Sequence, residues 1–552
     1  MRSAAALPVI GGTLLFFGVC LGFLLSTPTL NGADEEFHVD RVVAAAHGAL
    51  LPGPGSLPES TAVQRGADLY VRSTMIRNGP SLAEFAPLPR DERPSLDQLG
   101  GAARPPDGST EDAVSNYQTQ HPPLYYDLMG AAMWLMPGAD SIPLDQLVFW
   151  LRLFNVLLML PVPALLWAGA KALFGPGPQA VAAAFLPAFV PGLPRIAATV
   201  TNDTLAVLIG AALIWLALKV MGGDLTRRTA VLIAAVAVAG SLTKLTVMIL
   251  TPLIVLAYLI GWRRSGRPPP PATIATLAIG ALLAALWWVV SLIRFGSLFA
   301  APQAWGSRYL KQLGAPRAAD DPADFGFFLR QMVKQVPLRL FGSLGLHEPP
   351  QLPWPLLIAL CASLPITLIA AVIAYRRVRW DLLIIWGFAA GLMVLMVRES
   401  WATYSQFRAL AGIQGRYVYP AVAGLLIPFA AGLVVFLGRA RRWTPAVAAA
   451  LATLISGWAL YLSFGFTWLH RFETLTPGNL RRAVATMAGH FPFGKPVPQL
   501  IALLGVAAVI GGLVIAVRCV PRGRSGRPAV RQLSPAGDLR GPGGGSGPDG
   551  QG

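Results

Sequence analysis

The sequence predicts an all-α polytopic membrane protein. Of its 552 residues, 54% are hydrophobic and only 13% are charged, whereas a soluble domain usually carries about 25% charged residues. The mean hydropathy is +0.56. Apolar runs of about 20 residues, long enough to cross a bilayer, recur along the chain. Together these observations predict that lipid, rather than water, surrounds most of the fold.

We expect about twelve transmembrane helices from the apolar runs. The first is interpreted as an uncleaved span rather than a signal peptide, because the chain continues as a multispan protein. The predicted spans cover roughly residues 7–26, 148–171, 178–199, 204–221, 229–244, 246–262, 272–294, 352–375, 380–398, 417–437, 445–468 and 498–518.

Arginine clusters predict the orientation. Every second connection carries one, at 227–228, 263–267, 376–379 and 439–442. Cytoplasmic loops are enriched in Lys and Arg, so both termini of this multi-pass cell-membrane protein are expected in the cytoplasm. The net charge of +17 is attributed to these loops, which argues against nucleic acid as a partner. The loops expected outside are 27–147, 295–351, 399–416 and 469–497.

Two domains follow from this scheme. Residues 1–518 are expected to form the membrane domain, with 27–147 as a large first extracytoplasmic loop and 295–351 as a second. Residues 519–552 are rich in Gly and Pro and are predicted to be a disordered cytoplasmic tail.

Residues 121–137 are apolar enough to suggest a further span. The segment is short and contains Asp127, and counting it as a crossing would move the later arginine clusters outside. We therefore predict an interfacial or re-entrant helix on the outer side. The alternative is a true span, which would invert the topology downstream.

An acidic cluster follows the first span, where residues 34–38 read DEEFH. The carboxylates of Asp34 and Glu35, together with His38, are side chains that bind a divalent cation or provide a general base. The alternative is a solvated acidic turn in which Asp34 caps a helix.

Two further motifs lie at predicted membrane boundaries. His121 precedes two prolines, which favour an extended approach to the next helix and hold the imidazole at the membrane surface. Asp203 lies in a short turn between two spans, from which it could reach the acidic cluster or simply cap a helix. For the motif around His121, the alternative is helix punctuation with an aromatic belt.

Three basic residues also lie near the outer ends of spans. Arg416 follows Gly415, and a guanidinium can bind a phosphate through two parallel hydrogen bonds. Arg152 and Lys244 lie in comparable positions. A charge at membrane depth indicates function by default, whereas an interfacial anchor or a snorkelling side chain is the alternative.

The order of these motifs resembles that of a known superfamily. In sequence order the motifs are DExxH at 34–38, HPPLYY at 121–126, RLFN at 152–155, NDTLA at 202–206, LTKLT at 242–246 and QGRYVYP at 414–420. The pattern resembles the GT-C superfamily of polyprenyl-phosphate-sugar glycosyltransferases, which includes the protein O-mannosyltransferases and the aminoarabinose transferases of lipid A. It resembles most closely a bacterial branch marked by PPDExxH and QGRY. The resemblance runs from about residue 7 to residue 437.

The resemblance implies a GT-C-like fold with juxtamembrane helices in the first outer loop. It implies inverting transfer of a sugar from a polyprenyl-phosphate donor to an envelope glycan, lipid or protein acceptor on the outer face of the bilayer. Asp34 and Glu35 match the acidic pair that acts as catalytic base or metal site, and Asp203 matches a further acid. Residues 31–33 read NGA instead of the prolines usual before this pair, and the outer C-terminal domain of some members is absent, so the acceptor class stays open.

The resemblance also implies a donor-phosphate site. His121 and Arg416 match the residues near that phosphate, and Arg152 and Lys244 are expected to contribute. A divalent cation, Mg²⁺ or Mn²⁺, is an optional cofactor, with Asp34, His38 and Asp203 as candidate ligands.

Two other functions stay open at this point. A transporter or flippase for a lipid-linked sugar would place charged groups deep within spans, whereas most charges here lie at predicted span ends. A non-catalytic membrane protein of envelope assembly would not require Asp34, His121, Asp203 and Arg416 to converge. A spatial arrangement that scatters these residues would favour the second alternative.

Overall fold

The computed structural model describes residues 2–53, 56–72, 82–104, 116–296, 322–342, 351–408, 410, 412–470, 473–474 and 476–521. The chain forms two units, Met1–Val520 and Pro521–Gly552, and only the first is described in detail. The predicted tail lies, from residue 522 onward, outside the described residues. The same holds for residues 297–321 and 343–350 of the predicted second outer loop.

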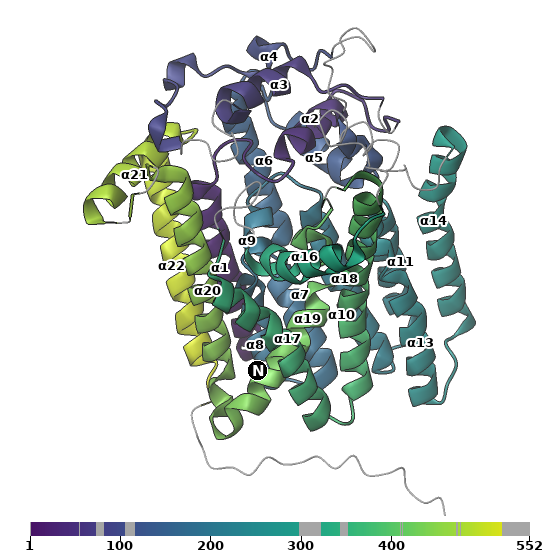
Figure 1. Cartoon of the computed structure of the whole chain (residues 1–552). Coiled ribbons are helices and arrows are strands. Elements are labelled where there is room, and N and C mark those ends of the chain that lie inside the picture. The colour runs from purple at the N-terminus through teal and green to yellow at the C-terminus, as the bar shows by residue number, and fades with distance from the viewer. Residues whose placement is uncertain are drawn as a thin grey trace, which may run out of the picture. The chain divides into compact units, whose positions relative to one another are not determined.

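Helices form the described part of the chain (Figure 1). The α-helices are α1 (Arg2–Ser26), α2 (Glu35–Ala46), α3 (Thr61–Ala67), α4 (Leu96–Leu99), α5 (Leu124–Trp134), α6 (Leu144–Met159), α7 (Val162–Phe174), α8 (Pro178–Phe185), α9 (Gly192–Ala197), α10 (Asp203–Met221), α11 (Arg227–Ser241), α12 (Leu245–Met248), α13 (Thr251–Ser265), α14 (Pro271–Phe295), α16 (Phe325–Pro337), α17 (Trp354–Ala374), α18 (Arg379–Phe407), α19 (Val422–Leu437), α20 (Thr444–Trp468), α21 (Pro477–His490) and α22 (Pro496–Arg518).

Short 3₁₀ or π-helical turns join several of these helices. They are η1 (Asp68–Arg72), η2 (Leu82–Glu84), η3 (Arg90–Glu92), η4 (Tyr117–Gln120), η5 (Leu186–Phe189), η6 (Leu338–Gly342), η7 (Gly415–Tyr417), η8 (Tyr419–Ala421) and η9 (Gly438–Trp443). An isolated antiparallel bridge joins Ser95 and Pro143.

Nine stretches of the described chain are long and apolar enough to cross a membrane. They are Ala6–Ser26, Leu144–Phe174, Asp203–Met221, Leu245–Ser265, Pro271–Phe295, Trp354–Ala374, Arg379–Phe407, Tyr419–Trp468 and Pro496–Arg518. The eighth folds as two helices, α19 and α20, joined by η9. The protein is thus an all-helical, multi-pass membrane protein, and ten of the twelve predicted spans lie in these stretches.

The two remaining predicted spans are shorter than expected. Residues 178–199 do not form one helix, because Pro187 and Pro191 lack the amide hydrogen that continues a helix, and the apolar helix ends at Phe189. Helix α11 has 15 residues. At 1.5 Å per residue it is about 22 Å long, less than the roughly 30 Å of a bilayer core.

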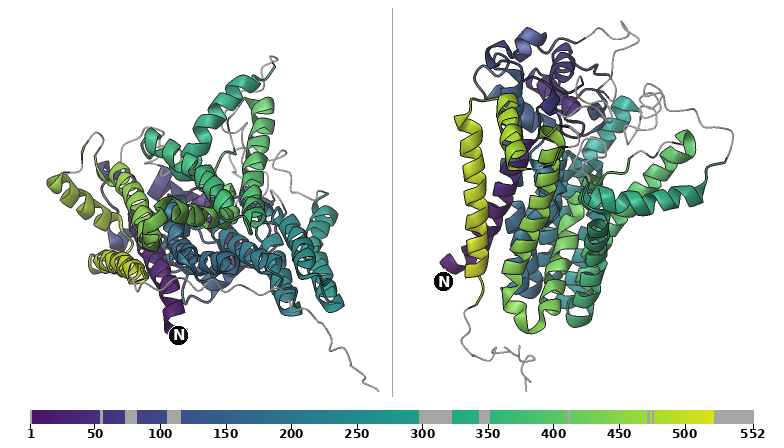
Figure 2. Two further views of the ribbon diagram at one scale, coloured as in Figure 1. Left: turned by 90° about the horizontal axis from the view of Figure 1, so that it is seen from below. Right: turned by 60° about the vertical axis from the view of Figure 1, so that its left-hand side comes forward.

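Glycines bring α1 into close contact with its neighbours. A Cβ atom on Gly12 would lie 2.2 Å from the carbonyl oxygen of Ala184 in α8, and one on Gly18 would lie 2.5 Å from that of Gly505 in α22. Only glycine permits such approaches, as at many membrane helix contacts. Figure 2 shows α1 running alongside α22. This packing fixes the end of α1 that leads to Asp34.

Helices of the first long loop lie together at one end of the bundle. Helix α2 packs against α5 and α3, and α3 packs against α4 (Figure 1). Helix α5 has 11 residues, about 16 Å in length, and is too short to cross a bilayer. This agrees with the interpretation of residues 121–137 as a helix that does not span.

The N-terminus lies at the opposite end of the bundle from α2 (Figures 1 and 2). At that end the last turn of α13 meets the first turn of α18, where Arg264 Nη1 lies 3.0 Å from Asp381 Oδ2. Helix α10 begins with Asp203 near α2 and ends near the arginines of 227–228. The arginine clusters and the acidic motif are therefore at opposite ends of the helices.

Candidate active site

The turn before α2 separates two adjacent carboxylates. Asp34 has φ 58° and ψ 18°, in the left-handed region, and Glu35 begins the helix. A non-glycine residue in this region is uncommon and marks a constrained turn. The amide of Gly32 donates to Glu35 Oε2 at 2.8 Å. The two neighbouring side chains consequently have different partners.

Glu35 forms a buried ion pair with Arg152 of α6. Arg152 Nε donates to Oε1 at 2.7 Å and Nη2 donates to Oε2 at 2.5 Å. The amide of Val200 also donates to Oε1, at 2.9 Å, and Glu35 is 0% exposed. Each carboxylate oxygen of Glu35 therefore has two donors, which leaves little capacity for a substrate.

Arg152 also donates hydrogen bonds to two backbone carbonyl groups just beyond the end of α1. Its Nη1 donates to the carbonyl oxygen of Thr27 at 2.7 Å and its Nη2 to that of Pro28 at 2.6 Å. With the two bonds to Glu35, four of the five guanidinium N–H groups are engaged. In this arrangement Arg152 joins the end of α1 to the start of α2 and does not face the remaining candidate residues.

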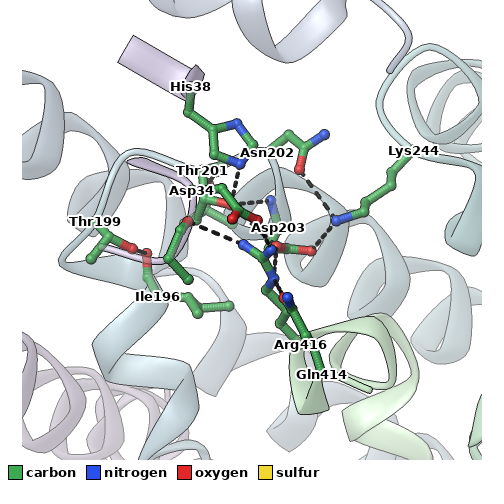
Figure 3. Close-up of polar contacts among 12 residues, drawn as sticks. Asp34, His38, Ile196, Thr199, Thr201, Asn202, Asp203, Lys244, Gln414 and Arg416 are labelled. Carbon is green, nitrogen blue, oxygen red and sulfur yellow. Dashed lines mark hydrogen bonds and ion pairs between the residues drawn. The ribbon is translucent and has the colours of Figure 1, made fainter. Parts of the chain in front are cut away.

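Asp34 contacts a different arginine, Arg416 of η7. Arg416 Nη2 donates to Asp34 Oδ2, and Nη1 donates to the carbonyl oxygen of Ala33 at 3.2 Å (Figure 3). The Arg416 Nε also donates to Gln414 Oε1 and lies 3.5 Å from Asp203 Oδ2. One guanidinium thus connects two carboxylates that are far apart in the sequence.

Asp203 completes the cluster at the start of α10. Lys244 Nζ lies 2.5 Å from Asp203 Oδ1, and Thr201 Oγ1 donates to Oδ2 at 3.1 Å (Figure 3). Asp203 is 0% exposed. Lys244 also lies 5.2 Å from the ring centre of Tyr417. We call Asp34, Asp203, Lys244 and Arg416 the central cluster.

Both candidate histidines are neutral neighbours of this cluster. His38 Nδ1 lies 3.0 Å from the Tyr126 hydroxyl and Nε2 lies 3.3 Å from Thr201 Oγ1. Burial, reinforced by Arg416, holds the pKa of His38 well below its usual value. Burial and the nearby Lys244 lower the pKa of His121 to about 3. Neither imidazole carries a charge near neutral pH.

Asp34 is the most accessible acid of the central cluster. Its side chain is 29% exposed, whereas that of Asp203 is 0% exposed. Burial raises the pKa of the Asp34 carboxyl, but Arg416 and a hydrogen bond from Tyr117 outweigh it, so the pKa lies below its ordinary value. Asp34 is therefore an ionised carboxylate at the edge of a buried cluster.

The described residues contain no group of three or more His, Cys, Asp or Glu side chains suited to a metal ion. The carboxylates of Asp34 and Asp203 are paired with Arg416 and Lys244, and both nitrogens of His38 have neighbours. This arrangement does not fit a divalent cation, because ammonium and guanidinium groups occupy the positions beside the carboxylates.

Sequence reasoning assigned no role to several contact residues. Tyr126, Asn202 and Gln414 lie within the motifs and Thr201 directly precedes one, so their closeness in sequence to the motif residues was the available signal. Tyr117, which hydrogen-bonds to Asp34, lies in the first loop outside any motif. The contact between Tyr117 and Asp34 depends on the tertiary position of η4 beside α2, which the sequence does not indicate.

A family model described as "Predicted membrane protein (DUF2142)" matches residues 15–425. The chain belongs to the DUF2142 family. The matched range includes every residue of the central cluster and the Glu35–Arg152 pair. No curated protein matches this DUF2142 chain.

Two solved structures show weak similarity to this DUF2142 protein. ArnT from Cupriavidus metallidurans bound to undecaprenyl phosphate has a TM-score of 0.44 and 14% identity, covering 93% of this chain and 77% of that one. The oligosaccharyltransferase of Archaeoglobus fulgidus in the apo form has a TM-score of 0.38 and 13% identity, covering 92% and 55% respectively. The chain thus spans about half the length of the latter.

Proposed function

We propose that this protein is a membrane glycosyltransferase with a GT-C-like fold, which transfers a sugar from a polyprenyl phosphate to an acceptor with inversion. The convergence of the central cluster carries this proposal. Arg416 contacts Asp34 across 382 positions of sequence, and Asp203 and Lys244 join the same network. A non-catalytic assembly protein does not require such convergence.

Asp34 is the proposed general base. It is ionised, and it is the cluster carboxylate nearest to solvent. It accepts the proton from an acceptor hydroxyl or amine while the acceptor atom attacks the anomeric carbon of the sugar. The bond between this carbon and the phosphate oxygen breaks on the opposite face, which inverts the configuration. The electron pair leaves with the polyprenyl phosphate.

Arg416 and Lys244 are the proposed partners of the departing phosphate. Both are buried cations near helix ends, and fixed cations stabilise charge that develops on a leaving group. Asp203 contacts both of them, so its proposed role is to hold their positions. His121 adds a neutral imidazole close to the same two cations.

Glu35 and Arg152 have a different proposed role. Their hydrogen bonds to each other and to backbone groups of residues 27, 28, 32 and 200 fix the turn that presents Asp34. We therefore assign them to positioning rather than to the base and the phosphate site. No step is assigned to Mg²⁺ or Mn²⁺.

The position of the cluster favours chemistry over transport. Asp203 begins α10, Lys244 precedes α12, and Arg416 precedes α19, so the cluster is at helix ends rather than midway along spans. The arginine clusters at the other end support an extracytoplasmic site with both termini cytoplasmic. A polyprenyl donor anchored in the bilayer would reach such a site from its edge.

A deletion strain tests the proposal. Loss of the enzyme is expected to cause accumulation of one polyprenyl-phosphate sugar, measured by lipid mass spectrometry, and loss of that sugar from an envelope product. The wild-type gene should reverse both changes and the Asp34→Asn variant should reverse neither. Asp91→Asn, in an exposed acid of the same loop, is the matched control and should behave as wild type. Full complementation by Asp34→Asn would contradict the proposal.

A further inference from the structure

One polar side chain beside the central cluster has an unsatisfied donor. Asn202 is 0% exposed, and its Nδ2 has no hydrogen-bond partner. Its Oδ1 accepts from Lys244 Nζ at 3.3 Å. Because an ammonium only donates, the atom facing Lys244 must be the oxygen, and this fixes Nδ2 as the free N–H group.

A nearby buried asparagine, Asn155, has hydrogen-bond partners for both ends of its side-chain amide. Asn155 is also 0% exposed, but its Nδ2 donates to the Tyr125 hydroxyl and to the carbonyl oxygen of Thr199, both at 2.9 Å. Its Oδ1 accepts from Thr204 at 2.8 Å. Nearly all buried polar groups are satisfied in this way. Asn202 Nδ2 is one of several buried side-chain atoms without a partner among the described residues, and it lies beside the central cluster, where a ligand can complete it.

The surroundings of Asn202 favour an anionic ligand. Asn202 is the residue before α10, a helix of 19 residues, and its side chain makes no capping hydrogen bond. The start of a helix carries partial positive charge and attracts anions. Lys244 Nζ, which also pairs with Asp203 Oδ1 at 2.5 Å, donates to the oxygen of the same amide (Figure 3).

We propose that Asn202 Nδ2 donates a hydrogen bond to a phosphate oxygen of the polyprenyl-phosphate ligand, beside Lys244. The assignment rests on the proposed function and names a binding residue that the motif analysis left without a role. Since Asn202 is fully enclosed while Asp34 is partly exposed, a phosphate held at Asn202 is shielded from water and the acceptor approaches from the side of Asp34.

The test measures binding of farnesyl phosphate, with farnesol as the matched probe without phosphate, to the full chain in detergent micelles. Wild type should bind farnesyl phosphate more tightly than farnesol. Asn202→Ala should raise the Kd for farnesyl phosphate by about 10-fold or more, the usual effect of losing a hydrogen bond to a charged group. Its Kd for farnesol should not change, which also shows that the variant is folded.

Two controls sharpen the test. Asn202→Ser keeps a hydroxyl donor and should lie between wild type and Asn202→Ala, whereas Asn479→Ala, on α21, should match wild type. A Kd for farnesyl phosphate within about twofold of wild type in Asn202→Ala overturns this inference alone. Equal wild-type affinity for the two probes instead overturns the phosphate site and the proposed function with it.

Discussion

Asp34 and Glu35 are adjacent in sequence, but their side chains differ in burial and in hydrogen-bond partners. Glu35 is fully buried, and four donors from Arg152, Gly32 and Val200 saturate its oxygens. Asp34 is partly exposed and shares Arg416 with Asp203. A saturated ion pair fixes a backbone, whereas an ionised carboxylate at the edge of a cation cluster can take a proton. The difference arises from one left-handed residue, Asp34, before α2.

The largest expected effect is on activity at Asp34. Asp34→Asn keeps the size of the side chain but cannot accept a proton, so the rate of transfer should fall by about 10²- to 10⁴-fold, the usual contribution of a general base. The assay is sugar transfer by the purified variant, with its melting temperature measured in parallel. A fall of less than threefold would show that Asp34 is not the base. It would also contradict the functional contrast between Asp34 and Glu35.

The next effect is on stability at Glu35. Glu35→Leu leaves Arg152 as an unpaired buried charge, and breaking such a pair costs about 3–5 kcal/mol. Thermal unfolding should show a large fall in melting temperature. Replacing both residues with Leu should recover part of the loss, because no uncompensated charge then remains. A variant that unfolds normally but is inactive would show that Glu35 has a chemical rather than a structural role.

A smaller effect on stability is expected at Asp127 of α5. Unlike Asp34 and Glu35, this carboxyl has a raised pKa. Burial, only partly opposed by Arg41, raises its pKa from 3.8 to about 6. Because the folded-state pKa is raised, the protonated form favours folding, and this stability is lost as the pH rises through about 6. Asp127→Asn should therefore raise the melting temperature relative to wild type at pH 8 but not at pH 4. Equal shifts at both pH values would contradict this account.

The smallest expected effect is the pH dependence of activity near neutrality. The pKa of Asp34 lies below 3.8, and those of His38 and His121 lie well below 6.5. Between about pH 5.5 and 7.5 these groups keep one charge state, so the transfer rate should change by less than about twofold. A steep rise through pH 6.5 would indicate that a histidine, rather than Asp34, takes the proton.

Parts of the fold could be predicted because they depend on composition alone. Spans such as α1, α14 and α22 are continuous apolar helices, and their predicted limits agree with the structure within a few residues. The segment 178–199 was predicted wrongly as one span, since apolar composition does not reveal where prolines end a helix inside a bundle.

The candidate site was likewise predictable from the sequence only in part. Motif order was enough to suggest that Asp34, Asp203, Lys244 and Arg416 meet, because each lies at a predicted outer helix end. Which of two adjacent acids pairs with Arg152 depends on the backbone angle of Asp34. The unsatisfied amide of Asn202 is likewise a property of tertiary packing, and no local pattern could have indicated either.

The most direct measurement is the release of polyprenyl phosphate from a panel of polyprenyl-phosphate sugars by the protein in liposomes. Wild type is expected to convert one donor in an acceptor-dependent manner to a product of inverted configuration. Asp34→Asn should bind that donor with wild-type affinity and release almost no polyprenyl phosphate. Release by Asp34→Asn at the wild-type rate, or a product of retained configuration, would contradict the assignment of Asp34 as the base for inverting transfer.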